Sequence, residues 1–288
     1  MAPRRQAPTV RLRRLAAELR RLRKGADLTR EDVSDKTGIN NATLYRIETA
    51  RARPQARTLT SLLNLYEVDD EQRDYLTGLC RDATQQGWLR PYHSELPEEY
   101  TAYISFESEA QGVRNYESLF IPGLLQTEDY ARSVIRGVLP SATEAEVEDR
   151  VRARIERQEG LAKDTPLKFW AVLDEAALRR VVGGPAVMRT QLDHLVSAAK
   201  APNVTFQVIR FGAGAHPGMP GQFVLMDFVD PMDTNLIYID TMAGDLFLES
   251  AADISRYRAI FDNLVAVALS PNDSASLVAE IASELKGG

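Results

Sequence analysis

The chain has 288 residues, of which 44% are hydrophobic and 26% charged, a composition that excludes a disordered, collagenous or membrane-embedded protein. The single cysteine, Cys80, excludes an internal disulfide, and three histidines are too few for a conventional Cys/His zinc site, so we expect no metal or other cofactor. The longest apolar run, 264–269, is far shorter than the roughly 20 residues of a membrane helix. We therefore expect a cytoplasmic protein.

Charge is distributed unevenly along the chain. Residues 1–57 contain 15 Lys and Arg against 6 Asp and Glu, whereas residues 58–288 contain 20 against 35. A basic head on an acidic body is typical of a nucleic-acid-binding module joined to a domain with another role. The length also favours two domains. We expect a DNA-binding domain over 1–83 with its core at 11–68, a linker over 84–97, where glycine and prolines interrupt any periodicity, and a second domain over 98–288.

The basic head predicts four helices. Over 11–24, leucines and an alanine recur at steps of three and four and form one apolar stripe. The other faces of this helix carry arginines: Arg11, Arg13, Arg14, Arg20, Arg21 and Arg23. A short second helix is expected to begin after Thr29, an N-cap with Asp32 three residues on, and to end at Gly38, which can adopt the left-handed conformation. Asn40 or Asn41 would cap a third helix, and a fourth is expected over 59–66.

The third predicted helix has one face available to DNA. Leu44 and Ile47 lie three residues apart and must face the core. The outer face then carries four side chains: Asn41, Ala42, Tyr45 and Arg46. Asparagine can pair with adenine, arginine with guanine, and alanine can contact a thymine methyl. Helix, short helix, glycine turn and helix is the helix-turn-helix order, in which the third helix enters the major groove.

A family resemblance is carried by the stretch LTREDVSDKTGINNATLYRIETARARP, residues 28–54. It resembles the Cro/C1 repressor class, also called the XRE-type family, with its Gly-Ile turn, a recognition helix ending in Ile-Glu and a later proline. The resemblance covers 11–68 and implies an all-α, lambda-repressor-like fold. It implies base contacts from the four side chains of the outer face and backbone contacts from a second set: Thr29, Arg30, Thr43, Arg51 and Arg53. One departure is Ala50, where glycine is usual, which weakens the C-cap.

The acidic body predicts several helices. Their expected ranges are 122–137, 141–162, 185–200, 252–269 and 273–286. Ser141 and Glu144 have the spacing of a capping box at the start of the second of these helices. Two charge pairs, Glu146 with Arg150 and Glu148 with Arg152, are expected on its outer face.

Extended segments rich in β-branched and aromatic residues accompany these helices. They are expected at 112–121, 167–173, 204–211, 222–228 and 236–240. The helix over 185–200 would connect two of the strands as a parallel pair, whereas a turn at 231–234 would make the last two an antiparallel hairpin. The body is therefore predicted to be an α+β domain with a small mixed sheet.

No catalytic group of residues stands out. The segment FGAGAHPGMPG, residues 211–221, has four glycines, but a strand follows it where a phosphate-binding loop needs a helix. We interpret it as a flexible loop between strands or as a lid over a small ligand. His194 and Asp193 are adjacent on a helix and point in different directions, so they are no acid/base pair. We expect no enzyme; an enzyme with an autoregulatory DNA-binding head is the weaker alternative.

A second resemblance is carried by three stretches: FIPGLLQTEDYAR (120–132), LDEAALRRVVGGPAVMRTQLDHL (173–195) and FGAGAHPGMPGQFVLMDF (211–228). They resemble an antitoxin-like C-terminal domain common in actinomycete regulators, whose genes commonly lie beside one for a small partner protein. We expect a dimeric, sequence-specific transcriptional regulator of a pseudo-palindromic operator. Its second domain would supply dimerisation and bind a regulatory protein or a small-molecule effector. The alternative is an antitoxin-like protein that binds the small partner and regulates its own operon.

Overall fold

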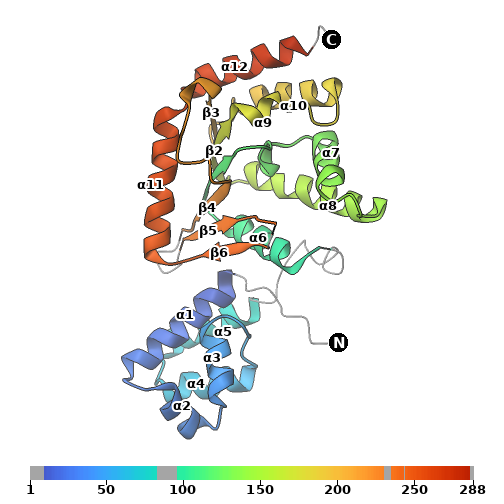
Figure 1. The fold of residues 1–288 in the computed structure, drawn as a ribbon. Helices are drawn as coiled ribbons and strands as arrows, with labels where there is room; N and C mark the ends of the chain where they lie inside the picture. Colours follow the sequence, from blue (N-terminus) through green and yellow to red (C-terminus); the bar gives the residue numbers. More distant parts are fainter. Residues whose placement is uncertain (1–9, 83–95, 230–234, 243, 286–288) are drawn as a thin grey trace. The chain divides into compact units, whose positions relative to one another are not determined.

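The computed structural model describes residues 10–82, 96–229, 235–242 and 244–285 (Figure 1). The described residues form two compact units. The N-terminal unit contains 10–82 and Pro97–Phe106, and the C-terminal unit contains Leu96 and the residues from Glu107 onward. The predicted linker, 84–97, lies almost entirely outside the described residues.

The N-terminal unit is helical, as predicted. Its helices are α1 (Val10–Gly25), α2 (Arg30–Thr37), α3 (Asn41–Glu48), α4 (Ala56–Leu65), α5 (Asp70–Asp82) and the first part of α6 (Glu98–Glu109). The apolar stripe of α1 packs with one buried face of each of the next four helices, through side chains such as Leu15, Val33, Leu44, Leu62 and Leu76. This small core holds the second and third helices against each other.

The C-terminal unit is built on a mixed sheet. Its six strands are β1 (Gly112–Glu117), β2 (Lys168–Asp174), β3 (Val204–Ile209), β4 (Phe223–Asp227), β5 (Leu236–Ile239) and β6 (Leu246–Leu248). The order is β3-β2-β1-β4-β5-β6. The parallel pair β2–β3 and the antiparallel pair β4–β5 confirm the predicted pairings, although the predicted turn at 231–234 lies outside the described residues. β1 pairs in parallel with β2 and antiparallel with β4, and β1 and β4 are the two central strands.

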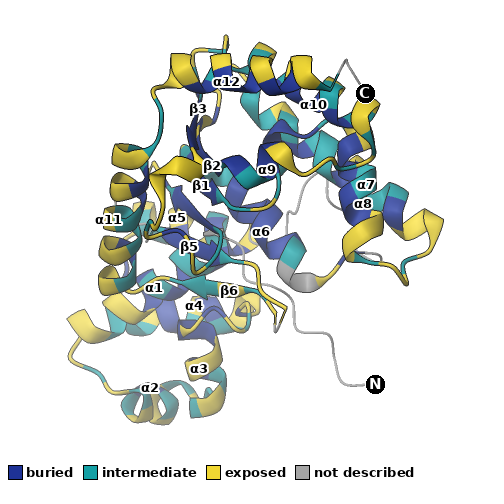
Figure 2. Ribbon diagram, turned by 45° about the horizontal axis from the view of Figure 1, so that its top comes forward, coloured by how far each residue is buried: buried dark blue, intermediate teal, exposed yellow. Residues whose placement is uncertain are grey.

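Helices cover both faces of the sheet. They are α7 (Glu128–Val138), α8 (Glu144–Arg157), α9 (Glu175–Arg179), α10 (Pro185–Ala198), α11 (Ala251–Val267) and α12 (Pro271–Glu284). Figure 1 shows α11 on one side of the sheet and α7 to α10 on the other. Figure 2 shows that α11 and α12 turn exposed residues outward, while much of the sheet is buried. The core under α11 contains Tyr116, Val172 and Phe223 of the sheet and Phe261 and Leu264 of α11.

The start of α8 differs from the prediction. The capping box is formed by Thr143 and Glu146, not by Ser141 and Glu144, because Thr143 is the last residue with an extended backbone before the helix. The helix also ends earlier than expected, at Arg157, where a 3-10 turn over Gln158–Leu161 follows. In the same way, the predicted helix from Pro122 begins with a 3-10 turn over Gly123–Leu125, and α7 starts only at Glu128.

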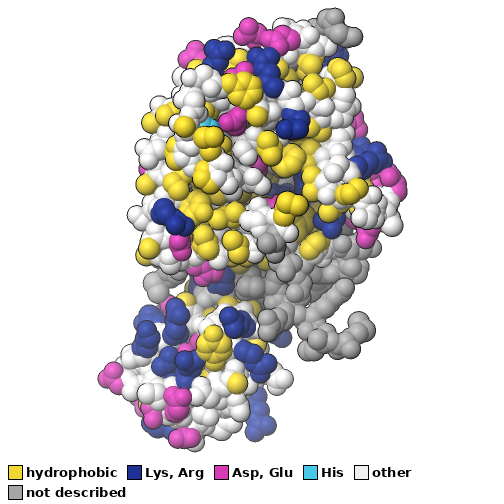
Figure 3. Space-filling view, viewed as in Figure 1, with side chains coloured by type: hydrophobic (Ala, Val, Ile, Leu, Met, Phe, Trp, Pro, Cys, Tyr) yellow, Lys and Arg dark blue, Asp and Glu magenta, His cyan; other side chains and the backbone are white. Residues whose placement is uncertain are grey.

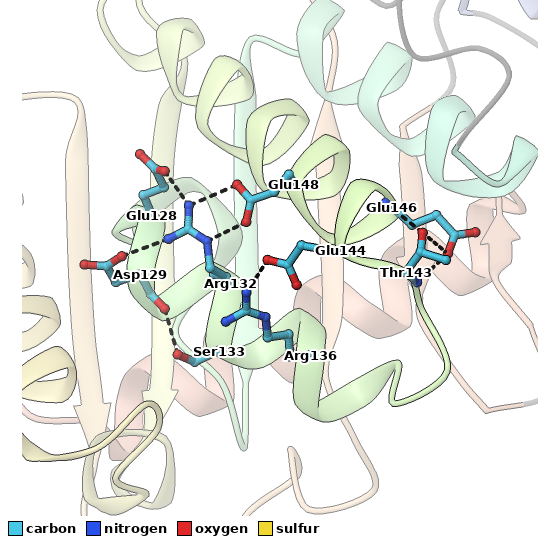
Figure 4. Close-up of polar contacts among 9 residues, drawn as sticks. All are labelled: Glu128, Asp129, Arg132, Ser133, Arg136, Thr143, Glu144, Glu146 and Glu148. Carbon is cyan, nitrogen blue, oxygen red and sulfur yellow. Dashed lines mark hydrogen bonds and ion pairs between the residues drawn. The ribbon is translucent and has the colours of Figure 1, made fainter.

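An arginine of α7 ties α7 to α8. Arg132 donates to Glu128 at 2.6 Å, to Asp129 at 2.8 Å and to Glu148 of α8 at 2.6 Å (Figure 4). Its hydrogen bond lowers the pKa of Glu148. Glu148, expected to pair within its own helix, is therefore held by the neighbouring helix, a contact between elements that helical spacing does not reveal.

Candidate nucleic-acid interface

The turn between α2 and α3 has the predicted geometry. Thr29 caps α2: its Oγ1 accepts from the Asp32 backbone N–H at 3.1 Å, and the Asp32 carboxylate accepts from the Thr29 backbone N–H at 2.8 Å. The Thr29 hydroxyl also donates to the Asp32 carboxylate at 2.6 Å, and this bond first, then the bond from the Thr29 N–H, lowers the pKa of Asp32. Gly38 adopts φ +72°, and its N–H donates to the Ser34 carbonyl at 2.8 Å. Asn40, rather than Asn41, caps α3 by accepting from the Ala42 N–H at 2.8 Å.

The recognition helix α3 presents an exposed face. Leu44 and Ile47 are 1% and 2% exposed and anchor the helix in the core. Ala42, Tyr45 and Arg46 are exposed on the other side, as the spacing predicts. After the helix, Ala50 adopts φ +55°, a left-handed conformation that glycine adopts more easily, which accords with the expected weak C-cap.

Asn41 differs from the other three predicted base-facing residues. It is half-buried, and its Nδ2 donates to Glu31 Oε1 of α2 at 2.6 Å. A base contact by Asn41 therefore requires this side chain to leave Glu31. Ala42, Tyr45 and Arg46 are the members of the predicted set that are exposed without such a bond to another helix.

Two predicted backbone-facing cations lie beside Tyr45. The guanidinium carbon of Arg30 is 5.1 Å from the centre of the Tyr45 ring, and that of Arg51 is 5.5 Å from it. Arg46 lies within 3.3 Å of the Thr43 hydroxyl on the same helix. We call the set Arg30, Ala42, Tyr45, Arg46 and Arg51 the α3 face. In it, residues from three segments form one basic surface around an aromatic ring, and Figure 3 shows Lys and Arg side chains gathered on this unit.

The other predicted backbone-facing residues have structural partners. The Thr29 hydroxyl is used by the cap of α2. Arg53 is exposed but donates through Nη1 to the Cys80 carbonyl of α5 at 3.2 Å. Cys80 itself is buried, and burial raises the pKa of its thiol. The structure thus gathers Arg30, Tyr45 and Arg51 and leaves Arg53 bound to the end of α5.

A buried ion pair behind α3 was not predicted. Arg23, expected on a solvated face of α1, is only 12% exposed and donates to both carboxylate oxygens of Glu48, at 2.6 and 3.0 Å. Its Nη1 also donates to the Leu28 carbonyl at 2.7 Å. The prediction failed because helical periodicity places a residue on a face but does not show which other helix covers that face. A glutamate directly after the buried Ile47, at the end of the recognition helix, was the available signal.

In the part of the chain that the structure describes, no three His, Cys, Asp or Glu side chains are grouped so that they could hold a metal ion. No described helix is long and apolar enough to cross a membrane.

These features define a helix-turn-helix DNA-binding domain, and residues 14–76 match a family described as a helix-turn-helix domain. Residues 100–280, more than half of the chain, match a family described as a domain of unknown function, DUF5753, and the chain belongs to that family. A search of curated proteins and a search of solved structures each found no significant match. The chain therefore joins a DNA-binding domain of known type to a domain of unknown function.

Proposed function

We propose that the protein is a cytoplasmic, sequence-specific transcriptional regulator that binds a pseudo-palindromic operator as a dimer. The observation that carries the proposal is the α3 face, where exposed Tyr45 and Arg46 are flanked by Arg30 and Arg51. Arginine can recognise guanine edges with two hydrogen bonds, and cations beside a recognition helix hold phosphates. In a dimer, two such helices would lie about 34 Å apart, one turn of DNA.

The two arginines have different proposed roles. Arg46, on the helix surface, would read a base, and Arg51, after the helix, would hold a phosphate. Arg46→Ala should then relax the preference at one base position and cost ~1–3 kcal/mol on the operator alone. Arg51→Ala should weaken all sequences alike and reduce the slope of log K against log salt by about 0.9.

The test is fluorescence-anisotropy titration of the full-length variants with an operator selected from a random pool and with a scrambled duplex, each at two salt concentrations. Arg20→Ala is the control for loss of one positive charge, because Arg20 is exposed on α1 and is not a member of the α3 face. It should lose at most a small electrostatic contribution. Equal losses on operator and scrambled DNA for both Arg46→Ala and Arg51→Ala would contradict the two roles.

For the C-terminal unit we propose a regulatory rather than a catalytic role: it supplies dimerisation and receives a small ligand or a regulatory protein. An antitoxin-like role is the second candidate, and exposed apolar side chains favour it. Phe211 is 61% exposed, Met219 68%, and Met242 fully exposed. These side chains are available for contact with a partner protein. Co-purification of the chain with the product of the adjacent gene, lost on Phe211→Asp and Met219→Asp, would support that candidate; unchanged behaviour of these variants would contradict it.

A further inference from the structure

The carboxyl ends of four strands meet at one edge of the sheet. β1, β2 and β3 run parallel, and β5 runs in the same direction because β4 lies antiparallel between it and β1. From β1 the chain proceeds to β2 and β3 on one side and then returns to β4 on the other side. In sheets with parallel strands, small ligands bind outside the carboxyl ends where the strand order changes direction. In this sheet that point is the end of β1, at Tyr116.

The segment 211–221 is held against this edge. The His216 side chain is only 5% exposed, and its Nε2 lies 3.3 Å from Asp174 Oδ2 at the end of β2. Its Nδ1 accepts from the Gly218 N–H at 3.3 Å, so Nε2 carries the proton and donates to Asp174. Gly218 lies on the Tyr116 ring: a Cβ there would be 2.5 Å from Tyr116 Cζ. Only glycine fits at this contact.

Among the residues that the structure describes, the Tyr116 hydroxyl has no hydrogen-bond partner, although Tyr116 is fully buried. A buried hydroxyl without a partner is unfavourable and calls for an explanation. The neighbouring carboxylate does not supply one: Asp174 Oδ1 accepts from the Ala176 N–H, Oδ2 faces His216, and neither oxygen bonds the hydroxyl. Burial first, and then the charges of Asp174 and Glu117, raise the pKa of Tyr116, so its hydroxyl stays protonated and can donate.

The start of the segment borders a depression of about 490 Å³, lined by Phe211, Ala213, Val267 and Leu269 together with Glu175 and Arg210; Tyr116 is not part of this lining. This volume lies within the range of small-ligand sites. Phe211 and Met219 expose apolar surface at the two ends of the segment. The negative charge of Asp174 disfavours an anionic ligand at the Tyr116 hydroxyl.

The segment also has the backbone of a movable cover. Gly214 adopts φ +68° with ψ −139°, and Gly221 adopts φ +148°, conformations in which other residues are strained. These glycines flank His216 and Gly218, the two residues that hold the segment down. Changes at a few backbone angles would lift Gly218 from the Tyr116 ring once His216 leaves Asp174.

We propose that the segment 211–221 is a lid over a small-molecule site, and that the ligand is an uncharged, largely apolar compound whose oxygen, such as a carbonyl, accepts a hydrogen bond from the Tyr116 hydroxyl. His216 is the latch, and its bond to Asp174 holds the lid closed. This inference rests on the proposed function only in calling the ligand an effector of DNA binding; the site itself stands on the geometry of the C-terminal unit.

The test uses prodan, an uncharged naphthyl ketone whose fluorescence moves to longer wavelength when its carbonyl accepts a hydrogen bond, with the full-length protein and without DNA. We expect saturable binding to the wild type. Tyr116→Phe should bind about fivefold more weakly, which corresponds to ~1 kcal/mol for one hydrogen bond, and the bound dye should emit at shorter wavelength. Because this hydroxyl has no partner in the free protein, the variant should be at least as stable as the wild type.

Two further variants separate the site from general effects on folding. Tyr130→Phe is the matched control: Tyr130 is also fully buried, but its hydroxyl accepts from the Ile121 N–H at 3.2 Å. This change should lower the melting temperature and leave the emission of the bound dye unchanged. His216→Ala should speed dye association, because it removes the latch.

Absence of saturable binding to the wild type would overturn the inference, as would equal affinity and emission for Tyr116→Phe and the wild type. Failure of the proposed function is a separate result: it would appear as loss of operator preference, with the dye titrations unchanged. A shift in operator affinity on addition of the dye, absent in Tyr116→Phe, would join the two.

Discussion

The buried ion pair between Arg23 and Glu48 is predicted to stabilise the N-terminal unit behind the recognition helix α3. Replacing Glu48 with Gln removes the negative charge and one of the two acceptors while keeping the shape of the side chain. The Glu48 side chain is 6% exposed and that of Arg23 12%, so water can replace little of what is lost. The Glu48 hydrogen bond is also the main reason that the pKa of Arg23 is raised. The change therefore leaves a largely buried guanidinium without its counter-charge.

The magnitude follows from the contacts that remain. Breaking a buried pair by removing one partner typically costs ~3–5 kcal/mol. Here Gln retains one acceptor, and Arg23 Nη1 keeps its bond to the Leu28 carbonyl at 2.7 Å. We therefore expect a loss of about 2–3 kcal/mol in the stability of the N-terminal unit. Replacing both partners, as Arg23→Met with Glu48→Leu, should recover most of it, because a well-packed apolar pair has no charge to desolvate.

The assay is native-state hydrogen exchange of the full chain, followed by mass spectrometry on peptides from α1 and α3, which reports the free energy of opening of this unit. Asp35→Asn is the control, because Asp35 is exposed on α2 and its charge removal should change stability by less than about 0.5 kcal/mol. If Glu48→Gln costs no more than Asp35→Asn, or if the double variant is as unstable as the single one, the reasoning is wrong.

Three further predictions concern single sites. Burial raises the pKa of Glu117 from 4.5 to about 8. Because the folded state holds this proton more tightly than the unfolded state, the free energy of unfolding of the C-terminal unit should fall by up to ~5 kcal/mol as pH rises from 4.5 through 8. Urea titrations at several pH values should find most of this pH dependence missing in Glu117→Gln. In the wild type the Val208 N–H donates to Ser274 Oγ at 2.9 Å, and Ser274→Ala removes that partner. The free energy of unfolding from urea titration should fall by ~1–3 kcal/mol. A loss below about 0.5 kcal/mol would count against a buried hydrogen bond. Gly38→Ala places a side chain on a residue with φ +72°, where it is strained although nothing lies within 4 Å of the added carbon. The change should cost ~1 kcal/mol of stability and appear as faster hydrogen exchange in α2 and α3. Unchanged exchange would show that the variant's turn is not strained.

Local signals in the sequence were sufficient for the helix-turn-helix. Thr29 with Asp32, Gly38 and the Asn40–Asn41 pair specify caps and a turn through residues at most four apart. Hydrogen bonds at that range depend little on the rest of the fold. The sequence left open whether Asn40 or Asn41 is the cap; Asn40 caps α3, and the Asn41 amide donates to Glu31 of α2, a contact with another helix.

The sheet was predictable in part for a similar reason. The helix 185–200 implied the parallel pair β2–β3, and a short connection implied the antiparallel pair β4–β5. The central position of β1 was not predictable, because its partners start 56 residues later, at Lys168, and beyond 220. The three-residue strand β6 and the five-residue helix α9 are too short to show a hydrophobic period.

The candidate ligand site illustrates what sequence alone leaves out. The composition of 211–221 marked the segment as unusual, but the reason is a contact with Tyr116, about 100 positions earlier in the chain. The hydroxyl that lacks a partner is defined only after every neighbouring donor and acceptor has been placed. Such a feature follows from three-dimensional packing and has no counterpart in local pattern.

The most direct test of the central claim is selection of DNA from a random pool by the purified full-length protein at two salt concentrations. The account predicts a recurrent pseudo-palindromic motif, with half-sites one helical turn apart, that survives at the higher salt. Binding that shows no motif and collapses as salt rises would contradict it, because the basic head would then act only through nonspecific attraction to phosphates.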